Sequence, residues 1–321
     1  MKRLAVSACL LSFFLAAPSA AQPASPANAD EIVVTAQRSG IPVWRVRGSA
    51  GTLVLVGTIE DVAKGTNWNP DSLALALRQA DQVMFPQGAQ LTGGFLSILR
   101  AQGKARRMER LPAGQSLANY LPPNQYRRLL DLQRKGLLRP GFEFRRPLFV
   151  AYDLIEAGKG AEPSGHFLSI SRVDWKTDPE GFVRHSVNQY HLRLVPMRKV
   201  SLNGALDRLA RTPPAAHVPC LVAAADFAEA GPSAFQARSQ AWVTRRVAEV
   251  VDSPAEKTFT TCASEVRDMD DVGAIEESLR GVLRQPVTTV AVLELSTLAA
   301  PGQILDRLAA AGFEIRGPKW K

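Results

Sequence analysis

The apolar positions near the start of the folded part of the chain change from strand-like runs to helical spacing and back. Residues 43–46 and 53–57 are short apolar runs joined by the turn 48–51, which predicts two paired or neighbouring strands. Asn69-Pro70 predicts a helix start, with asparagine as the N-cap and proline in the first helical position. One apolar helical face follows, formed by Leu73, Ala76, Leu77 and Ala80. Residues 82–85 predict another strand, and this β-loop-α-β order is typical of a parallel α/β unit.

The middle of the chain has mostly helical spacing. It predicts helices at residues 124–135, 147–157, 187–192, 204–210, 217–230, 233–251 and 264–283. The end returns to the first pattern, with a β-branched strand at 288–295, a helix at 301–311, a glycine stop at Gly312 and a strand at 313–315. We therefore predict an α/β fold in which N- and C-terminal β-α-β units form one mixed sheet around a large helical insertion. A single domain is expected over residues 41–321.

The first residues have the features of an export signal. A positive start, Lys2-Arg3, precedes an apolar run that is shorter than the roughly 20 residues of a membrane-spanning helix, and small residues follow at 19–21. We expect residues 1–21 to be a signal peptide that is removed. The protein is then exported, either periplasmic or secreted, with no transmembrane segment in the mature chain. Residues 22–40 are expected to be a flexible N-terminal segment.

Removal of the signal takes away one of the three cysteines and leaves Cys220 and Cys262. An even number of cysteines in an oxidising compartment predicts a disulfide between them. Two buried free thiols are the alternative. No Cys-x-x-Cys pair is present, so the sequence supports neither a zinc ribbon nor a thioredoxin-like redox site.

The chain is basic. Its formal net charge is +9, which falls to +7 when the signal is removed, and basic residues gather at 104–107 and 145–146. For an exported protein, anionic lipid or an envelope polysaccharide is a better partner class than nucleic acid, and we expect no nucleic-acid partner. A solvated basic surface without a specific partner is the alternative interpretation.

Generic catalytic signatures are absent from the sequence. It has no Gly-x-Ser-x-Gly, Ser-x-x-Lys, Walker or His-Glu-x-x-His motif. None of the four histidines follows a predicted strand of the α/β units. The predicted strand 53–57 instead ends at Gly57, and Thr58 and Glu60 follow it. This strand end is where α/β proteins commonly place ligands. Gly57 and Thr58 are therefore candidate ligand-binding residues.

Several stretches together resemble the TraB/PrgY/GumN family, which is related to the Tiki proteins. They are "PVWRVRG", "GTLVLVGTIEDV" and "LALALRQADQVMF" near the start, and "LPAGQSLANYLPP" and "FQARSQAWVTRRVAEVV" in the middle. The strand-helix-strand layout at the end is similar too. The resemblance implies the same α/β fold and a metal site at the strand ends, built on a Gly-Thr-Ile-His strand end, a strand ending in glutamate and a Gly-x-x-His motif.

The chain departs from this pattern at the implied metal ligands. Glu60 stands where the resemblance implies the first histidine, and Phe85-Pro86-Gln87 stands at the implied glutamate. The second motif corresponds to residues 294–297, Glu-Leu-Ser-Thr, so Thr297 replaces the second histidine. Oxygen ligands favour Ca²⁺ or Mg²⁺ over zinc. We expect no cofactor, and a hard divalent cation is the alternative.

Three functions remain open from the sequence. The first is a catalytically degenerate exported protein that binds an unknown ligand, an envelope polymer or an envelope protein. The second is a residual metal-dependent hydrolase, of peptidase or esterase type, in which Glu60 and Glu294, with Thr297, are the candidate catalytic residues. This second function requires the two carboxylates to converge in one pocket.

The third function involves a TonB-type protein. Residues 31–36 read Glu-Ile-Val-Val-Thr-Ala, which resembles the TonB box of outer-membrane receptors, and such a box adds a strand to a sheet edge of its partner. Glu31, Ile32, Val33, Val34, Thr35 and Ala36 are therefore candidate partner-binding residues. This function requires the segment to be detached from the folded core. An edge strand of the same domain, or a disordered tail with strand-prone residues, is the alternative.

Overall fold

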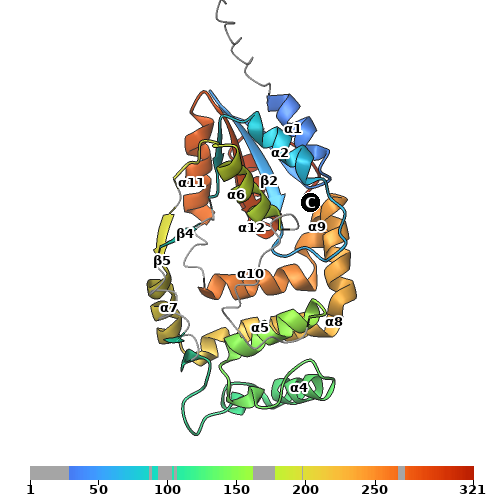
Figure 1. The fold of residues 1–321 in the computed structure, drawn as a ribbon, viewed down its shortest axis with the longest axis vertical. Helices are drawn as coiled ribbons and strands as arrows, with labels where there is room; N and C mark the ends of the chain where they lie inside the picture. The colour runs from blue at the N-terminus through green and yellow to red at the C-terminus, as the bar shows by residue number, and fades with distance from the viewer. Residues whose placement is uncertain are drawn as a thin grey trace, which may run out of the picture.

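The fold is known from a computed structural model that describes residues 29–86, 89–92, 103–104, 107–161, 178–196, 198–266 and 272–321. A five-stranded sheet forms one end of the molecule and a group of helices forms the other (Figure 1). The expected signal peptide, residues 1–21, lies outside the described residues. Among the residues described, no helix combines the length and the apolar character needed to cross a bilayer.

The sheet has the strand order β3-β6-β2-β1-β7, with strands β1 (Val43–Arg47), β2 (Thr52–Thr58), β3 (Gln82–Met84), β6 (Thr288–Glu294) and β7 (Glu314–Arg316). β2 and β3 both pair with β6 in parallel, whereas β1 pairs antiparallel with β2 and β7. The C-terminal strand β6 thus lies between two N-terminal strands. This arrangement confirms the predicted mixed sheet built from both ends of the chain.

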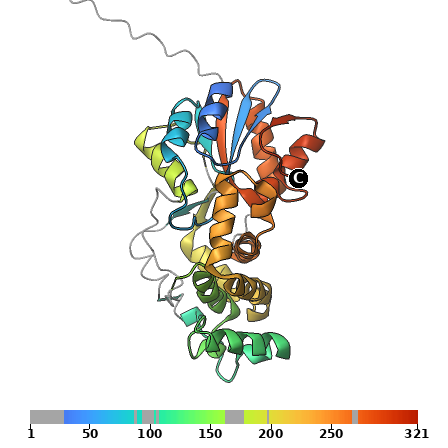
Figure 2. The same ribbon diagram turned by 90° about the vertical axis from the view of Figure 1, so that its right-hand side faces the viewer.

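Helices cover both faces of the sheet (Figure 2). One face carries α1 (Ala29–Gln37), α2 (Pro70–Arg78) and α6 (Pro179–Gln189), and the other carries α11 (Val272–Leu283) and α13 (Ile304–Ala310). The predicted start of α2 is confirmed, because the Asn69 side chain accepts a hydrogen bond from Ser72 N at 3.1 Å. A buried apolar core joins these helices to the strands and includes Trp44 and Trp242.

The predicted helical insertion forms a second apolar core away from the sheet. Its principal helices are α4 (Pro123–Arg134), α5 (Pro147–Gly158), α8 (Val218–Val243) and α10 (Pro254–Val266), with α7 (Leu202–Arg211) beside them. α9 (Val247–Val251) and α12 (Leu295–Ala299) lie between this core and the sheet. Short 3-10 turns occur at η1 (Leu117–Asn119), η2 (Phe142–Phe144) and η3 (Pro214–His217), and a small parallel sheet joins β4 (Ala89–Thr92) to β5 (Arg198–Ser201).

The break expected between helices 217–230 and 233–251 is present as a kink inside α8. Gly231 has φ of 71°, and Pro232 follows it. A positive φ costs glycine little, and proline lacks the amide hydrogen that a continuous helix would need, so the two residues together fix the kink. The second half of α8 ends at Val243, before the predicted limit. Arg245 there adopts φ of 60°, and α9 begins after it.

The N-terminal segment differs from the prediction. Residues 29–37 form α1, a helix, where the sequence suggested a flexible or extended segment. Ile32 is fully buried in the sheet core, whereas Val34 is 53% exposed. Asp30 forms an ion pair with Arg45 of β1. A helix that buries one apolar face and anchors its first turn to a strand is part of the fold, so the expected flexible segment 22–40 is wrong for residues 29–37.

Candidate functional site

Gly57 and Thr58, the candidate ligand-binding residues, lie at the carboxyl end of β2 and are both buried. Trp242 of α8 donates its indole N–H to the Gly57 carbonyl at 2.9 Å. The Thr58 hydroxyl donates to the Leu293 carbonyl of β6 at 3.0 Å. Both residues therefore hold β2 against its neighbours, and their role in ligand binding stays a prediction.

The close packing at Gly57 explains why glycine occupies this strand position. A Cβ atom there would lie 2.6 Å from Leu295 Cδ1 and 3.0 Å from the Trp44 ring. Gly57→Ala should therefore force Leu295 and Trp44 to move, and we expect the free energy of unfolding to fall by about 1–3 kcal/mol. Urea unfolding followed by tryptophan fluorescence measures this change.

Gly281→Ala is the matched control for this substitution. Gly281 lies inside α11, and the nearest atom to an added Cβ is Arg284 Nη2 at 4.0 Å. Because alanine favours helix more than glycine does, the control should raise stability by up to about 1 kcal/mol. Equal effects of the two substitutions would contradict the packing argument.

A buried ion pair fixes the loop that follows β2. The Arg238 guanidinium donates from Nε at 2.9 Å and from Nη2 at 2.6 Å to Glu256 Oε2. Its Nη1 donates to the carbonyls of Glu60 at 2.9 Å and Asp61 at 3.1 Å. The side chains of Arg238 and Glu256 are 0% and 4% exposed. Arg238 therefore connects α8 and α10 to the main chain of the loop.

Asp61, next to Glu60, forms a second charged contact at the end of β2. Asp61 has φ of 54° and pairs with Lys159, which also contacts Glu156 at 2.8 Å. Burial lowers the pKa of Lys159, but the carboxylates of Asp61 and Glu156 outweigh it, so the pKa lies above its usual value. The Lys159 ammonium thus remains protonated at neutral pH and holds the loop to α5.

Asp178, the N-cap of α6, has a raised pKa. Burial is the largest cause, and the negative charges of Glu180 and Asp61 add to it, against the hydrogen bond from Gly181 N. The region around Asp61 therefore contains several carboxylates, of which Asp61 and Glu156 pair with Lys159 and Glu180 pairs with Arg184. These groups come from α5, α6 and the β2 loop.

The candidate catalytic residues Glu60 and Glu294 follow neighbouring parallel strands. The register pairs Thr58 of β2 with Glu294 of β6, so Glu60 lies two residues beyond this pair. Glu60 is exposed and Glu294 is half-buried, and Thr297 lies in the short helix α12 that begins after Glu294. The carboxyl ends of β2 and β6 are therefore adjacent in the sheet. A catalytic role for Glu60, Glu294 and Thr297 stays a prediction.

The metal site that the family resemblance implies does not fit these residues. The two positions implied for histidine hold Glu60 and Thr297, and no imidazole follows β2 or β6. Across the described parts of the chain, no group of three or more histidine, cysteine, aspartate or glutamate side chains is arranged to hold a metal ion. The donor set at the ends of these two strands is therefore unlike the imidazole-rich sets that bind transition metals.

A pocket of about 340 Å³ opens beside Thr297. Helices α9, α10 and α12 and the segments that follow α12 and begin α11 form its walls. Its lining residues are Val251, Asp252, Lys257, Thr260, Thr261, Val272, Ser296, Thr297, Ala300, Pro301 and Gln303. The lining thus combines apolar walls with several hydroxyl groups and one residue of each charge.

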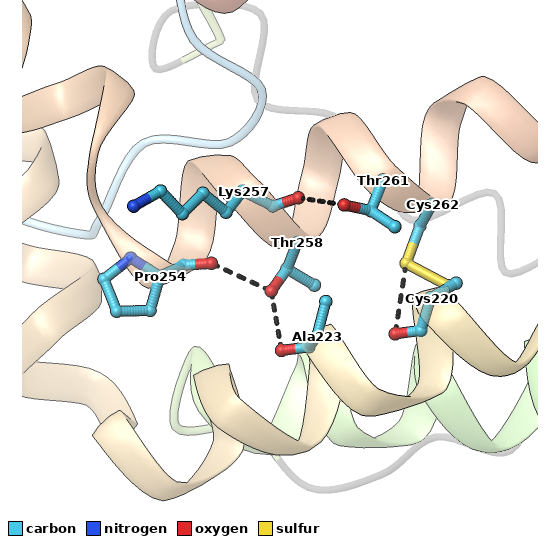
Figure 3. Close-up of a disulfide and its surroundings, with 7 residues drawn as sticks. All are labelled: Cys220, Ala223, Pro254, Lys257, Thr258, Thr261 and Cys262. Atoms are coloured by element: carbon cyan, nitrogen blue, oxygen red, sulfur yellow. Dashed lines mark hydrogen bonds between the residues drawn. A yellow bond between two sulfur atoms is a disulfide. The ribbon is translucent and has the colours of Figure 1, made fainter.

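One wall of the pocket is held in place by a disulfide. Cys262 of α10 is bonded to Cys220 of α8, with a Cα–Cα distance of 4.8 Å, which confirms the predicted pair. One turn earlier, the Thr258 hydroxyl lies 2.8 Å from the Ala223 carbonyl of α8. In Figure 3 Cys262 and Thr258 face α8, and Thr261, which lines the pocket, does not point toward α8. The same helix thus bonds to α8 and contributes to the pocket.

The candidate partner-binding residues 31–36 lie within α1. Ile32, Thr35 and Ala36 are buried there. Pairing of this segment as an added strand would require α1 to unfold and expose Ile32 to water. The segment is thus helical in this structure and not extended, and its role in binding a TonB-type partner stays a prediction.

Sequence reasoning missed the residues that organise the strand-end loop. Arg238 and Trp242 lie within the quoted stretch "FQARSQAWV", and Glu256 lies eighteen positions after Arg238. Arg238 is three residues after Phe235 and four before Trp242, so helical spacing places it on their apolar face. A charged residue on such a face is a signal for a buried ion pair, but the sequence cannot show which carboxylate it meets.

Comparison with known proteins agrees with the resemblance found in the sequence. The TraB/PrgY/gumN family model matches residues 42–317, which covers most of the chain, so the protein belongs to this family. No curated protein and no solved structure matches the chain.

Proposed function

We propose that this member of the TraB/PrgY/gumN family is a small-molecule-binding protein that works outside the cytoplasm and has lost its family's metal-dependent chemistry. The observation that carries the proposal is the pocket between α9, α10 and α12, which includes Thr297 at the position implied for a metal-binding histidine. Its volume of about 340 Å³ is within the usual range for small-ligand sites. The Cys220–Cys262 disulfide supports an oxidising compartment.

The lining of the pocket favours a ligand without net charge. Its two ionisable residues are Lys257 and Asp252, and their side chains lie 3.6 Å apart, so their charges largely cancel. Val251, Val272 and Pro301 supply apolar surface, and the hydroxyl groups can donate or accept hydrogen bonds. A neutral or zwitterionic molecule with an apolar body and one or two polar groups matches this lining. Amino acids, dipeptides and monosaccharides are the compounds to test first.

Filling the pocket with a large side chain should abolish ligand binding. Thr260 lines the pocket from an exposed position on α10, so Thr260→Trp should block the space without disturbing the core. Ligand-detected NMR of the full chain would screen the three compound classes. We expect a compound that binds the wild-type protein to bind Thr260→Trp at least tenfold more weakly.

Ser278→Trp provides the matched control for this experiment. Ser278 is exposed on α11 and does not line the pocket, so the same bulky side chain there should leave binding unchanged. Equal binding of a compound to all three proteins would place its site elsewhere. A wild-type protein that binds nothing in the panel would also count against the proposal.

A further inference from the structure

The positive charge of the protein is concentrated in one part of the helical region. The continuous segment 107–146 contains nine arginine and lysine residues and three acidic residues, a formal charge of +6 out of the +9 of the whole chain. This segment includes α4 and the 3-10 turns η1 and η2. We call residues 107–146 the basic tip, because Figure 1 shows α4 at the end of the molecule farthest from the sheet.

Three residues of the basic clusters at 104–107 and 145–146 make contacts within the protein: Lys104, Arg145 and Arg146. Arg145 pairs with Glu109 at 2.8 Å and also with Asp153, and its side chain is 15% exposed. Arg146 is buried and donates to the Thr212 carbonyl. Lys104 pairs with Asp207, while residues 105 and 106 lie outside the described residues. Lys104, Arg145 and Arg146 therefore supply little of the surface charge that the sequence suggested, whereas Arg107 is exposed.

Other cations of the basic tip remain exposed. Within the described residues, no ion pair forms at Arg107, Arg110, Arg127, Lys135 and Arg139, and all five are exposed. Arg128 and Arg134 differ, because they pair with Asp226, Glu229 and Asp131. Glu143 lies in the same segment and Lys135 also acts on Glu229, so the five cations outnumber the carboxylates near them and leave the tip positive.

An exposed aromatic ring lies among these cations. Phe144 is 56% exposed, the most exposed of the large apolar side chains in the described residues. Its backbone is fixed, because the Phe144 carbonyl accepts a hydrogen bond from Leu111 N at 2.9 Å, and Arg110 bridges to Arg145 directly beside it. Lys135 and Arg139 precede Phe144 in the loop between α4 and α5. The ring is thus exposed on a backbone that these contacts hold in place, in the same segment as the exposed cations.

We propose that the basic tip docks on an anionic lipid surface, with Phe144 entering the headgroup layer. Lysine and arginine are attracted to anionic headgroups, and an aromatic ring that leaves water at the interface adds apolar burial. The position of α4 at one end of the molecule leaves the tip free to meet a flat surface. An anionic polymer would use the charges but would gain little from a single exposed aromatic ring. Lipid is therefore the better match.

Vesicle co-sedimentation of the full chain tests this proposal. The probes are vesicles of phosphatidylcholine with 30% phosphatidylglycerol and vesicles of phosphatidylcholine alone. We expect the wild-type protein to bind only the anionic vesicles, and binding to weaken as salt is raised. Lys135→Ser with Arg139→Ser should weaken binding about 25-fold, since each basic residue near an anionic surface contributes about fivefold. The double variant should also show a smaller salt dependence.

Phe144→Ser separates the aromatic contribution from the charges. It should weaken binding several-fold and leave the salt dependence unchanged, because no charge is removed. Arg245→Ser with Arg284→Ser is the control, since both residues are exposed and lie outside the tip. This control removes the same charge as the tip double variant and should bind like the wild-type protein.

Three outcomes would overturn the proposal. The first is equal binding to both kinds of vesicle, and the second is equal weakening by the tip and control double variants. The third is binding of the wild-type protein to immobilised polygalacturonate, lost in the tip variant, when neither protein binds vesicles. In that case the tip recognises an acidic polysaccharide instead. Thermal unfolding of each variant confirms that the comparison is made between folded proteins.

Discussion

Arg238→Ala is expected to lower the free energy of unfolding by about 3–5 kcal/mol, the usual effect of breaking a buried ion pair by removing one partner. The substitution leaves the Glu256 carboxylate, 4% exposed, without its cation. It also takes the donor away from the carbonyls of Glu60 and Asp61. Urea unfolding at pH 7, monitored by tryptophan fluorescence, measures the change.

Arg246→Ala gives the matched control for Arg238→Ala. Arg246 also pairs with a glutamate, Glu249 at 2.6 Å, but the two side chains are 50% and 57% exposed. An exposed pair of this kind contributes at most about 1 kcal/mol.

The double variant Arg238→Met with Glu256→Leu should be more stable than Arg238→Ala, because it leaves no buried charge unpaired. Similar losses from Arg238→Ala and Arg246→Ala would show that the buried pair does not organise the loop.

Removal of the disulfide is the second change with a large expected effect. Cys220 and Cys262 are separated by 42 residues, and closing a loop of that length in the unfolded chain corresponds to about 4 kcal/mol in the chain-entropy model. We expect Cys220→Ala with Cys262→Ala to lose about 2–4 kcal/mol, measured by urea unfolding.

Reduction provides an independent check on the disulfide. A phosphine reductant should destabilise the wild-type protein by a similar amount and leave the double alanine variant unaffected. An unchanged midpoint for the wild-type protein under reducing conditions would contradict a stabilising disulfide. An effect of the reductant on the alanine variant would instead point to a change unrelated to this bond.

The sheet could be predicted from the sequence because each strand has a recognisable local pattern of apolar residues. β2 and β6 are continuous apolar runs, as buried parallel strands are, and Asn69-Pro70 marks the start of α2. The kink in α8 could be predicted from Gly231-Pro232 for the same reason. These signals depend on residues within one or two turns of each other.

Features that depend on distant contacts could not be predicted in the same way. The segment 31–36 is rich in β-branched residues, which favours a strand, yet burial of Ile32 against the sheet makes it part of a helix. The pairing of Arg238 with Glu256 joins two helices, and nothing in the local pattern identifies the partner. The pocket has walls from α9, α10 and α12, so it exists only once these elements are packed together.

Arg238 holds the loop after β2 through main-chain atoms, so the side chains of this loop can change without changing its backbone. The guanidinium binds the carbonyls of Glu60 and Asp61, and every amino acid supplies the same carbonyl. The path of the loop is therefore set independently of which side chain residue 60 carries. Glu60 and a histidine in its place could therefore stand on one unchanged backbone. The shape of this loop can therefore be kept when the side chain of residue 60 changes, and the chemistry that the loop supports changes with that side chain.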